Sequence, residues 1–564
     1  MKFNKFEYER PNYEEIKKDY NQLVEQINNA STYEEQASLI KEVNAIRNDI
    51  STMGTLASIR NSINTEDEFY DKENEYWDEY GPLFSEMDDT FYKALVNSKF
   101  KEELTADLGK QFLNIAEYSL KAFSPEIITD MQEENKLTSE YSKLVASAKI
   151  EFDGKELNLS GLRPYMLSQD RVVREEANNA YFEFFTAHED EFDTLYDNLV
   201  KVRDKMAKTL GFNNFVELGY IRMMRTDYNP EMVKGFRKQV LEHIVPSANK
   251  LYERQAARIG VDNLAYFDES FEFLTGNAAP KGDAEFILQN GVKMYSELSP
   301  ETKEFFEFMV EGELLDLETK KGKQAGGYCT YIPNYKAPFI FSNFNTTSDD
   351  IDVLTHEAGH AFQVYRSRWI EVPDINFPTY ESCEIHSMSM EFITWPWMEL
   401  FFKEETDKYK FTHLGSAIKF IPYGITVDEF QHFVYENPTA TKEERKAAWR
   451  KLEEQYLPHK NYEGCDLLER GGWWLKQAHI FNSPFYYIDY TLAQICALQF
   501  WKRMKEDKEG AWQDYLNLCS VGGTKSFLEL VDYANLKSPF EEGCVSSIIS
   551  SINGWLDSVE DKNL

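Results

Sequence analysis

Apolar residues recur at helical spacing through the first part of the chain. One stripe is formed by Tyr13, Ile16, Tyr20, Leu23 and Ile27, and a second by Ala37, Ile40, Val43, Ile46 and Ile50. Residues three or four positions apart lie on the same face of an α-helix, so each stripe predicts an amphipathic helix with one buried side. We expect residues 12–60 to form a helical hairpin and residues 66–148 to continue as amphipathic helices.

The helical period is interrupted at residues 149–159. Apolar and polar residues alternate there around Asp153-Gly154, a pattern typical of a short β-hairpin. Helical periodicity resumes at Arg171, so the predicted hairpin separates two helical regions.

A second interruption follows the helical stretches at residues 230–260 and 283–310. The pattern of residues 326–333 and 339–345 predicts two strands that lead into the next helix. The exposed edge of such a strand can pair with an extended peptide, although a purely structural sheet is an equal alternative. The fold class that we expect is mainly α, with a small β-sheet.

Chain length predicts more than one lobe. The 564 residues exceed what a single core usually accommodates, so we expect two helical lobes with a cleft between them. No internal repeat or long linker separates the lobes, and we place the boundary near residue 190.

The formal net charge is −36, from 97 Asp and Glu against 61 Lys and Arg. Nucleic acids and anionic membranes would repel such a chain, and no dense basic run overrides the mean. The N-terminus lacks the apolar run of a signal peptide, and no stretch reaches the roughly eighteen apolar residues of a membrane span. Six cysteines without CxxC spacing indicate reduced thiols. We expect a cytoplasmic protein with neither nucleic-acid nor membrane partners.

The strongest chemical signal is the segment His356-Glu357-Ala358-Gly359-His360. Histidines at i and i+4 share a helix face, so both imidazoles can bind one metal ion with Glu357 beside them. Zinc with three protein ligands lowers the pKa of a bound water toward about 7, and Glu357 can take that water's proton. A chance match on a surface helix is disfavoured, because the flanking residues are apolar and buried imidazoles without partners are costly. We predict a zinc peptidase with one ion per chain.

The third ligand has to come from another segment. Gln363 and Arg366 stand where an HExxHxxGxxH motif would have Gly and His. Residues 379–392 predict a second helix that carries three carboxylates and a methionine on one face, namely Glu381, Glu384, Met388 and Glu391. A solvated acidic face is one explanation, and a metal ion that offsets the repulsion among the carboxylates is the other. In the second case one carboxylate binds the metal and the others orient the site.

These motifs resemble the thimet oligopeptidase family of zinc metallopeptidases, most closely its oligoendopeptidase F and Pz-peptidase branch. The resemblance covers about residues 190–550 and depends on the histidine motif, on the spacing to Glu384 and Glu391, and on residues 343–345 and 484–490. It implies Glu384 as the ligand beside His356 and His360. It also implies a deep channel around the site and short peptides as substrates. We therefore expect an N-terminal helical lobe at residues 1–190 and a zinc metallopeptidase catalytic domain at residues 191–564.

Peptide hydrolysis also requires a donor to the developing oxyanion, which contributes about 2.7 to 4 kcal/mol. His479 and Tyr490 are the candidates. In the family, and in the similar angiotensin-converting enzyme, a His followed about ten to twelve residues later by a Tyr has this role, and a Tyr three residues earlier contacts substrate. The resemblance thus implies a substrate contact at Tyr487, although the adjacent Tyr486 leaves the register open by one residue. We expect Tyr486, Tyr487 and Asn343 to contact substrate.

The combined prediction is a zinc-dependent oligoendopeptidase that cuts internal bonds of short peptides, with Glu357 as the base. Glu381, Glu391 and Asp352 are candidates to orient the imidazoles. One alternative is a dipeptidyl carboxypeptidase, which would hold the C-terminal carboxylate of its substrate. The other is a zinc-containing peptide-binding protein without turnover, which has no need for a general base.

Overall fold

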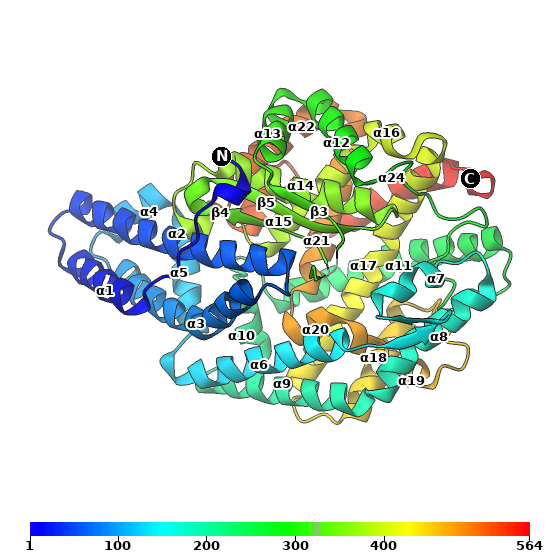
Figure 1. The fold of residues 1–564 in the computed structure, drawn as a ribbon, viewed down its shortest axis with the longest axis horizontal. Coiled ribbons are helices and arrows are strands. Elements are labelled where there is room, and N and C mark those ends of the chain that lie inside the picture. The colour runs from blue at the N-terminus through cyan, green and yellow to red at the C-terminus, as the bar shows by residue number, and fades with distance from the viewer. Residues whose placement is uncertain (321, 325) are drawn as a thin grey trace.

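The computed structural model describes residues 1–320, 322–324 and 326–564, and its N-terminal helices form a group of their own (Figure 1). They are α1 (Tyr13–Asn29), α2 (Tyr33–Ile63), α3 (Glu68–Val96), α4 (Lys101–Leu108) and α5 (Lys110–Ala122). The predicted hairpin at residues 12–60 is confirmed as α1 and α2. Tyr20, Ile27 and Ile40 from the two stripes are buried in a cluster that is separate from the main core. In Figure 1 these helices protrude at the left of the molecule.

The chain then enters the main body. The next elements are α6 (Ile128–Ala146), β1 (Ile150–Phe152), β2 (Lys155–Leu157), α7 (Arg163–Met166), α8 (Arg171–Ala187), α9 (Glu189–Thr209), α10 (Phe215–Arg222) and α11 (Pro230–Ile259). β1 and β2 are antiparallel, and Ile150 lies opposite Leu157. Asp153 and Gly154 both have positive φ, 50° and 69°, as a two-residue type I′ turn requires. The predicted β-hairpin is therefore confirmed.

A three-stranded sheet follows α12 (Ala284–Leu298) and α13 (Pro300–Glu311). Its strands are β3 (Leu315–Glu318), β4 (Tyr328–Ile332) and β5 (Ala337–Phe344), in the order β3-β5-β4. β5 is parallel to β3 and antiparallel to β4. The central strand β5 is almost continuously apolar because both its faces are buried, whereas β4 lies at an edge. Both strands predicted before the histidine motif are present.

The remaining elements surround the helix that carries this motif, α14 (Asp349–Ser367). They are α15 (Tyr380–Ile393), α16 (Glu399–Phe402), α17 (Thr406–Glu436), α18 (Lys442–Tyr456), α19 (Asp466–Glu469), α20 (Ala478–Asn482), α21 (Tyr487–Glu506), α22 (Lys508–Val521), α23 (Phe527–Tyr533) and α24 (Cys544–Ser558). α14 packs against β4 and β5 on one side and against α15 on another, and α15 also packs against α21. The two helices predicted to supply the metal ligands are thus in direct contact.

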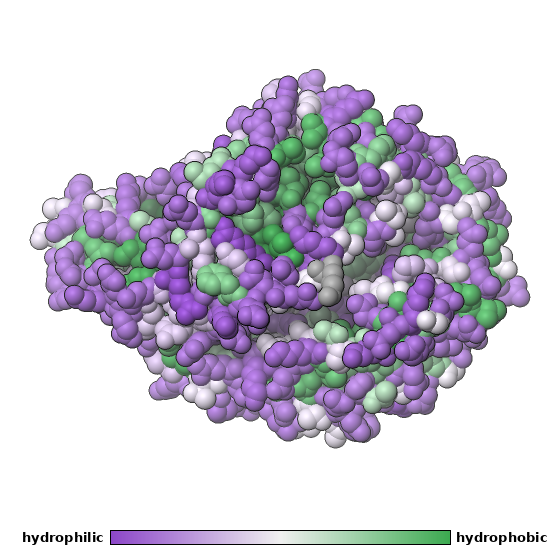
Figure 2. Space-filling view, in the orientation of Figure 1, coloured by the Kyte–Doolittle hydropathy of each residue, from purple (hydrophilic) through white to green (hydrophobic). Residues whose placement is uncertain are grey.

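The predicted fold class is confirmed: the chain is mainly helical, with the small sheet next to α14. The boundary near residue 190 stays a prediction. Within the described ranges, no helix combines the length and the apolar character needed to cross a bilayer. Figure 2 shows a largely hydrophilic face that is hollowed near its centre.

Candidate active site

α14 starts where the chain leaves the sheet. The Asp350 carboxylate accepts hydrogen bonds from the backbone N–H groups of Asn345 and Thr346, at 2.9 and 2.8 Å, and this closes the connection from β5. Asp349, Asp350 and Asp352 lie in the first helical turn, where the helix dipole favours negative charge. The histidine motif is therefore held at a defined distance from the sheet.

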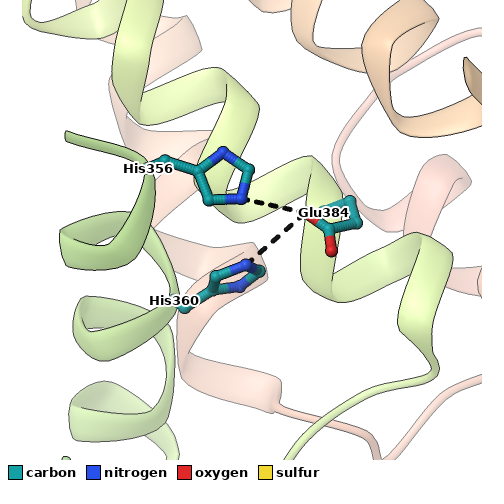
Figure 3. A group of neighbouring side chains, drawn as sticks. All are labelled: His356, His360 and Glu384. Carbon is teal, nitrogen blue, oxygen red and sulfur yellow. Dashed lines mark ion pairs between the residues drawn. The ribbon is translucent and has the colours of Figure 1, made fainter. Parts of the chain in front are cut away.

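His356 and His360 point from α14 toward Glu384 of α15 (Figure 3). Glu384 Oε2 lies 3.2 Å from His356 Nε2 and 3.5 Å from His360 Nε2. Tyr486 donates a hydrogen bond to Glu384 Oε1 at 2.7 Å, and Ser387 donates one to Oε2 at 2.9 Å. Although burial raises the pKa of Glu384, the two imidazoles hold it well below its usual range, so the ligand carboxylate is ionised.

A second row of side chains orients His356. Its Nδ1 lies 2.7 Å from Glu391 Oε1, and the other oxygen of Glu391 lies 2.8 Å from His413 Nε2. Trp395 donates its indole N–H to His413 Nδ1 at 2.9 Å. Because that nitrogen is an acceptor, His413 carries its proton on Nε2 and donates it to Glu391. Glu391 can then accept from His356 Nδ1–H, which leaves His356 Nε2 free to bind a metal.

The other two carboxylates predicted to orient the imidazoles have different partners. Asp352 accepts a hydrogen bond from Tyr409 at 2.5 Å, and burial raises its pKa to about 7. Glu381 accepts a hydrogen bond from Thr379 at 3.0 Å and lies near Asp489, and burial raises its pKa well above the usual range. From the acidic stripe on α15, Glu384 and Glu391 are the residues that contact the α14 histidines within the described part of the chain.

Glu357 is buried beside the two histidines, and its Oε2 has no hydrogen-bond partner among the described residues. Burial raises the pKa of Glu357 above the ordinary value for a glutamate. A buried carboxylate oxygen without a partner is costly, and it marks a place where a water or substrate group completes the site.

A cavity of about 610 Å³ contains the three potential ligands and Glu357. α5 contributes Gln111 and Ile115 to the wall, and the edge strand β4 contributes Tyr328 and Cys329. Further wall residues come from the segment before α15 and from the tyrosine segment, including Pro373, Asp374, Phe377, Tyr380, Tyr486 and Tyr490. The strand edge, the histidines and the tyrosines therefore line one cavity.

The tyrosine segment is held by a strained turn at Phe485, whose φ is 66°. The backbone N–H of Phe485 donates to Gln431 Oε1 at 2.8 Å, and its carbonyl accepts a hydrogen bond from the buried Arg225. Gly219 makes room for the ring, since a Cβ there would lie 2.5 Å from Phe485 Cδ2. Both peptide groups of the turn are thus fixed, and the turn directs the tyrosines toward α15.

The predicted oxyanion and substrate tyrosines occupy different positions. Tyr486 and Tyr490 line the cavity, with ring centroids 4.9 Å apart. The Tyr487 ring instead lies 5.7 Å from Phe420 and 5.8 Å from Tyr423. Tyr487 therefore belongs to an aromatic wall behind the cavity.

His479 lies behind the same tyrosines, with its ring centroid 5.0 Å from Tyr487 and 5.8 Å from Tyr490. Tyr423 donates to Gln477 Oε1 at 2.6 Å, which orients the amide so that its nitrogen donates to His479 Nδ1 at 2.9 Å. Burial lowers the pKa of His479, so the imidazole is neutral, with its remaining proton on Nε2. His479 is not among the residues that line the cavity of the histidines, so a contact of this N–H with the oxyanion stays a prediction.

The predicted substrate contact Asn343 is directed elsewhere in this structure. Its amide nitrogen donates to the backbone carbonyls of Gln324 and Gly326, at 2.8 Å each. Gly327, which follows Gly326 in the chain, lines the cavity beside Glu357. The contacts of Asn343 are therefore with the loop before β4, and a role in substrate binding stays a prediction.

The sequence reasoning missed several residues of the site. His413 contacts Glu391, and Gln477 contacts His479. Trp395 in turn supports His413, and Arg225 holds Asp489 and the turn at Phe485. Each is a single His, Trp, Gln or Arg without a motif around it, and all but Gln477 are far along the chain from their partners. Ser387, one helical turn after Glu384, was within reach of the i to i+3 rule, and Gln477 stands two residues before His479.

The donor set fits a zinc ion. Two ligand atoms about 2.0–2.1 Å from a tetrahedral ion lie about 3.3–3.4 Å apart, and the two nitrogen–oxygen distances at Glu384 are 3.2 and 3.5 Å. The three ligand atoms all lie within 4.8 Å of one another. Two imidazoles and one carboxylate with an adjacent cavity are typical of a catalytic zinc site with an open position.

The fold and the site define a helical metallopeptidase, and comparisons with known proteins identify its family. Residues 164–548 match the model of peptidase family M3, and residues 3–123 match the model of the peptidase M3 N-terminal domain. The chain therefore belongs to peptidase family M3, whose members are metallopeptidases.

Individual relatives carry oligopeptidase names. The solved structure of Pz peptidase A with inhibitor 2 is 60% identical, with a TM-score of 0.97 and full coverage of both chains. An oligoendopeptidase F homolog of Borreliella burgdorferi is 25% identical over 374 residues, or 64% of this chain; the match spans 61% of that relative's length. Oligoendopeptidase-F from Enterococcus faecium, at 15% identity and a TM-score of 0.66 over 98% of both chains, shares the fold. The resemblance to oligoendopeptidase F and Pz peptidase is thus supported, and the thimet branch stays a prediction.

Proposed function

We propose that the protein is a zinc-dependent oligoendopeptidase that hydrolyses internal bonds of short peptides. The observation that carries this proposal is the convergence of His356, His360 and Glu384 beside the buried, partnerless carboxylate oxygen of Glu357. The names of the relatives, oligoendopeptidase F and Pz peptidase, support the same substrate class.

His356, His360 and Glu384 would hold the zinc. When bound, zinc supplies Lewis acidity, which makes a water molecule nucleophilic near neutral pH and polarises the scissile carbonyl. Glu357 accepts a proton from the attacking water as the new C–O bond forms, and it later delivers that proton to the nitrogen of the breaking C–N bond. The raised pKa of Glu357 suits both transfers, because an acid–base catalyst works best when its pKa is near the operating pH.

Hydrogen-bond donors near the zinc site stabilise the oxyanion and hold the metal ligand. Tyr490 and His479 donate hydrogen bonds to the carbonyl oxygen as it becomes negative, a contribution of about 2.7 to 4 kcal/mol for one donor. Tyr486 holds Glu384, and the edge of β4 aligns an extended peptide through main-chain hydrogen bonds. Tyr487 supports the aromatic wall behind Tyr490.

The test is Glu357→Gln, which keeps the size of the side chain and removes the base. We expect one zinc per chain, as in the wild type, and a loss of hydrolysis of about 10²–10⁴-fold. Metal analysis of the pure protein and mass spectrometry of products from a mixed peptide library measure the two quantities. The exposed Glu404 supplies the matched control, since Glu404→Gln should change neither. Wild-type turnover in Glu357→Gln would refute the proposed mechanism.

A further inference from the structure

A second cavity, of about 490 Å³, borders the candidate active site. Its wall includes Gln477, whose amide contacts His479, and Phe420 and Tyr423, whose rings contact Tyr487. Asp352 and His413, from behind the histidine motif, also line it. The wall of this cavity therefore supports His479 through Gln477 and packs against Tyr487, next to the proposed oxyanion donors.

Two lysines of this cavity share one aromatic ring. The Nζ atoms of Lys460 and Lys476 lie 3.6 and 3.9 Å from the ring centroid of Trp473. Lys460 is neutralised by Glu269 at 2.8 Å. Lys476, by contrast, has no carboxylate within ion-pair distance among the described residues. Within the described part of the chain, the Lys476 ammonium group lies over the rings of Tyr181, Phe182 and Trp473.

The other charged groups of the wall leave Lys476 unneutralised. Arg163 contacts only the hydroxyl of Ser270, at 3.3 Å, and has no ion pair in the described part of the chain. Lys419 pairs with Glu272 at 2.8 Å. The remaining acidic groups are Asp352, which is bound by Tyr409, and Asp349, which is exposed. Two cations without a counter-ion thus face one cavity in a chain whose net charge is −36.

The electrostatic state of Lys476 reflects this arrangement. Burial, together with the nearby charges of Lys460 and Arg163, lowers its pKa to about 7, and Glu269 and Glu453 offset part of that effect. A carboxylate in the cavity would remove this penalty, since an opposite charge within a few ångströms favours the charged form of the amine. An ammonium group in a partly buried site forms a stronger hydrogen bond with an anion than with a neutral acceptor.

We propose that Lys476, together with Arg163, forms a subsite for a carboxylate of the bound peptide. The carboxylate is either the C-terminal group of the peptide or the side chain of an Asp or Glu residue. This subsite rests on the proposed peptidase function and adds a preference among its substrates: a peptide cut at the zinc site binds better when a carboxylate reaches Lys476.

The experiment compares peptides that differ only in one carboxylate. The first pair has uncharged side chains and ends in either a free carboxylate or an amide. The second set is amidated and carries Glu or Gln at one position, which is moved along the peptide. We expect the wild type to favour the carboxylate member of at least one set by about tenfold in kcat/KM, as for a single charged hydrogen bond. The set that shows the preference identifies the source of the carboxylate.

The variant Lys476→Met keeps an apolar side chain over Trp473 and removes the charge. We expect it to lose the preference while its kcat/KM for the amidated, uncharged peptide stays at the wild-type value. Lys476→Arg should retain the preference. The matched control is Lys505→Met, because Lys505 also stacks on a tryptophan, with Nζ 3.7 Å from the centroid of Trp501, but is absent from this cavity.

The possible outcomes separate the subsite from the function on which it rests. Equal cleavage of all members of both sets by the wild type would overturn the subsite and leave the peptidase intact. Cleavage of no peptide would overturn the proposed function. Cleavage of free-acid peptides alone, always with release of a dipeptide, would support the carboxylate subsite and overturn the endopeptidase assignment.

Discussion

Tyr486 and Tyr490 differ in what their side chains can do at the cavity. Tyr486 donates its hydroxyl proton to Glu384, whereas Tyr490 lines the cavity beside it. We expect Tyr490→Phe to lower kcat by about 10²–10³-fold with unchanged zinc content, as for loss of one oxyanion donor. Tyr486→Phe should instead weaken zinc affinity by about 10–100-fold, as for loss of a group that orients a ligand. Steady-state kinetics at saturating zinc and a zinc titration distinguish the two variants. If Tyr490→Phe weakened zinc binding and Tyr486→Phe lowered kcat instead, the two assignments would be reversed.

A buried acid that lines neither of the two cavities gives a prediction for stability. Glu453 is fully buried, accepts a hydrogen bond from Tyr462, and has its pKa raised to about 7 by burial. The folded state therefore keeps a proton that the unfolded state loses near pH 4.5, and stability contributed by this group falls as pH rises from 4.5 toward 7. Between pH 5.5 and 7.5 the loss should be about 2 kcal/mol.

Urea unfolding of the wild type and Glu453→Gln at these two pH values measures this contribution. Because glutamine cannot ionise, the variant should not lose this stability as the pH rises. Its free energy of unfolding relative to that of the wild type should therefore be about 2 kcal/mol higher at pH 7.5 than at pH 5.5. The same difference at both pH values would mean that Glu453 titrates near its ordinary pKa.

At the scale of elements, the site depends on how closely α14 approaches α15. Gly359 lies at the contact: a Cβ there would be 2.6 Å from Ser387 Cα and 2.7 Å from the carbonyl oxygen of His386. Both of these atoms belong to the backbone of α15, so the helices would have to separate. Glu384 would then move away from the two imidazoles.

We therefore expect Gly359→Ala to lower stability by about 1–3 kcal/mol, as for an overpacked core, and to weaken zinc binding. Gly235 of α11 is the matched control, since a Cβ there meets nothing within 4 Å. Gly235→Ala should be neutral or slightly stabilising, because alanine has the higher helix propensity. Thermal unfolding and metal analysis of both variants test this, and normal zinc content in Gly359→Ala would show that the helices adjust.

At the scale of the whole molecule, the N-terminal helices hold part of the cavity wall. Arg47 of α2 forms two hydrogen bonds with Asp374, at 2.7 and 2.9 Å, and both side chains are less than a tenth exposed. Asp374 lines the cavity that contains the histidines. This buried ion pair thus adds to the direct contribution of α5 in connecting the N-terminal group of helices to the substrate cavity.

Arg47→Met removes the counter-ion of the buried Asp374, which keeps a hydrogen bond from Tyr92, and should cost about 3–5 kcal/mol of stability. Because the wall segment loses its anchor and the zinc ligands do not, we expect a raised KM with little change in kcat or zinc content. Lys250→Met breaks an exposed pair with Asp557 and should cost less than about 1 kcal/mol. An unchanged KM in the destabilised Arg47 variant would show that the wall does not need this anchor.

The sequence by itself determined the features that depend on neighbours along the chain. Helical periodicity, the turn at Asp153-Gly154 and the strands before α14 follow from local backbone geometry. So does the placement of His356 and His360 on one helix face, because residues four positions apart in a helix are always neighbours. The donor types alone, two imidazoles and a nearby carboxylate, were enough to predict a metal site.

The tertiary structure decided which distant groups meet. Glu381, Glu384 and Glu391 are equivalent on the stripe of α15, and only the packing of α14 and α21 against that helix gives them three different sets of partners. The contacts of His413 with Glu391, and of Tyr486 rather than Tyr487 with Glu384, arise in the same way. Lys476 joins Lys460 on one ring only because the chain folds back over Trp473. Such approaches depend on the shape of the whole core, to which no local spacing rule applies.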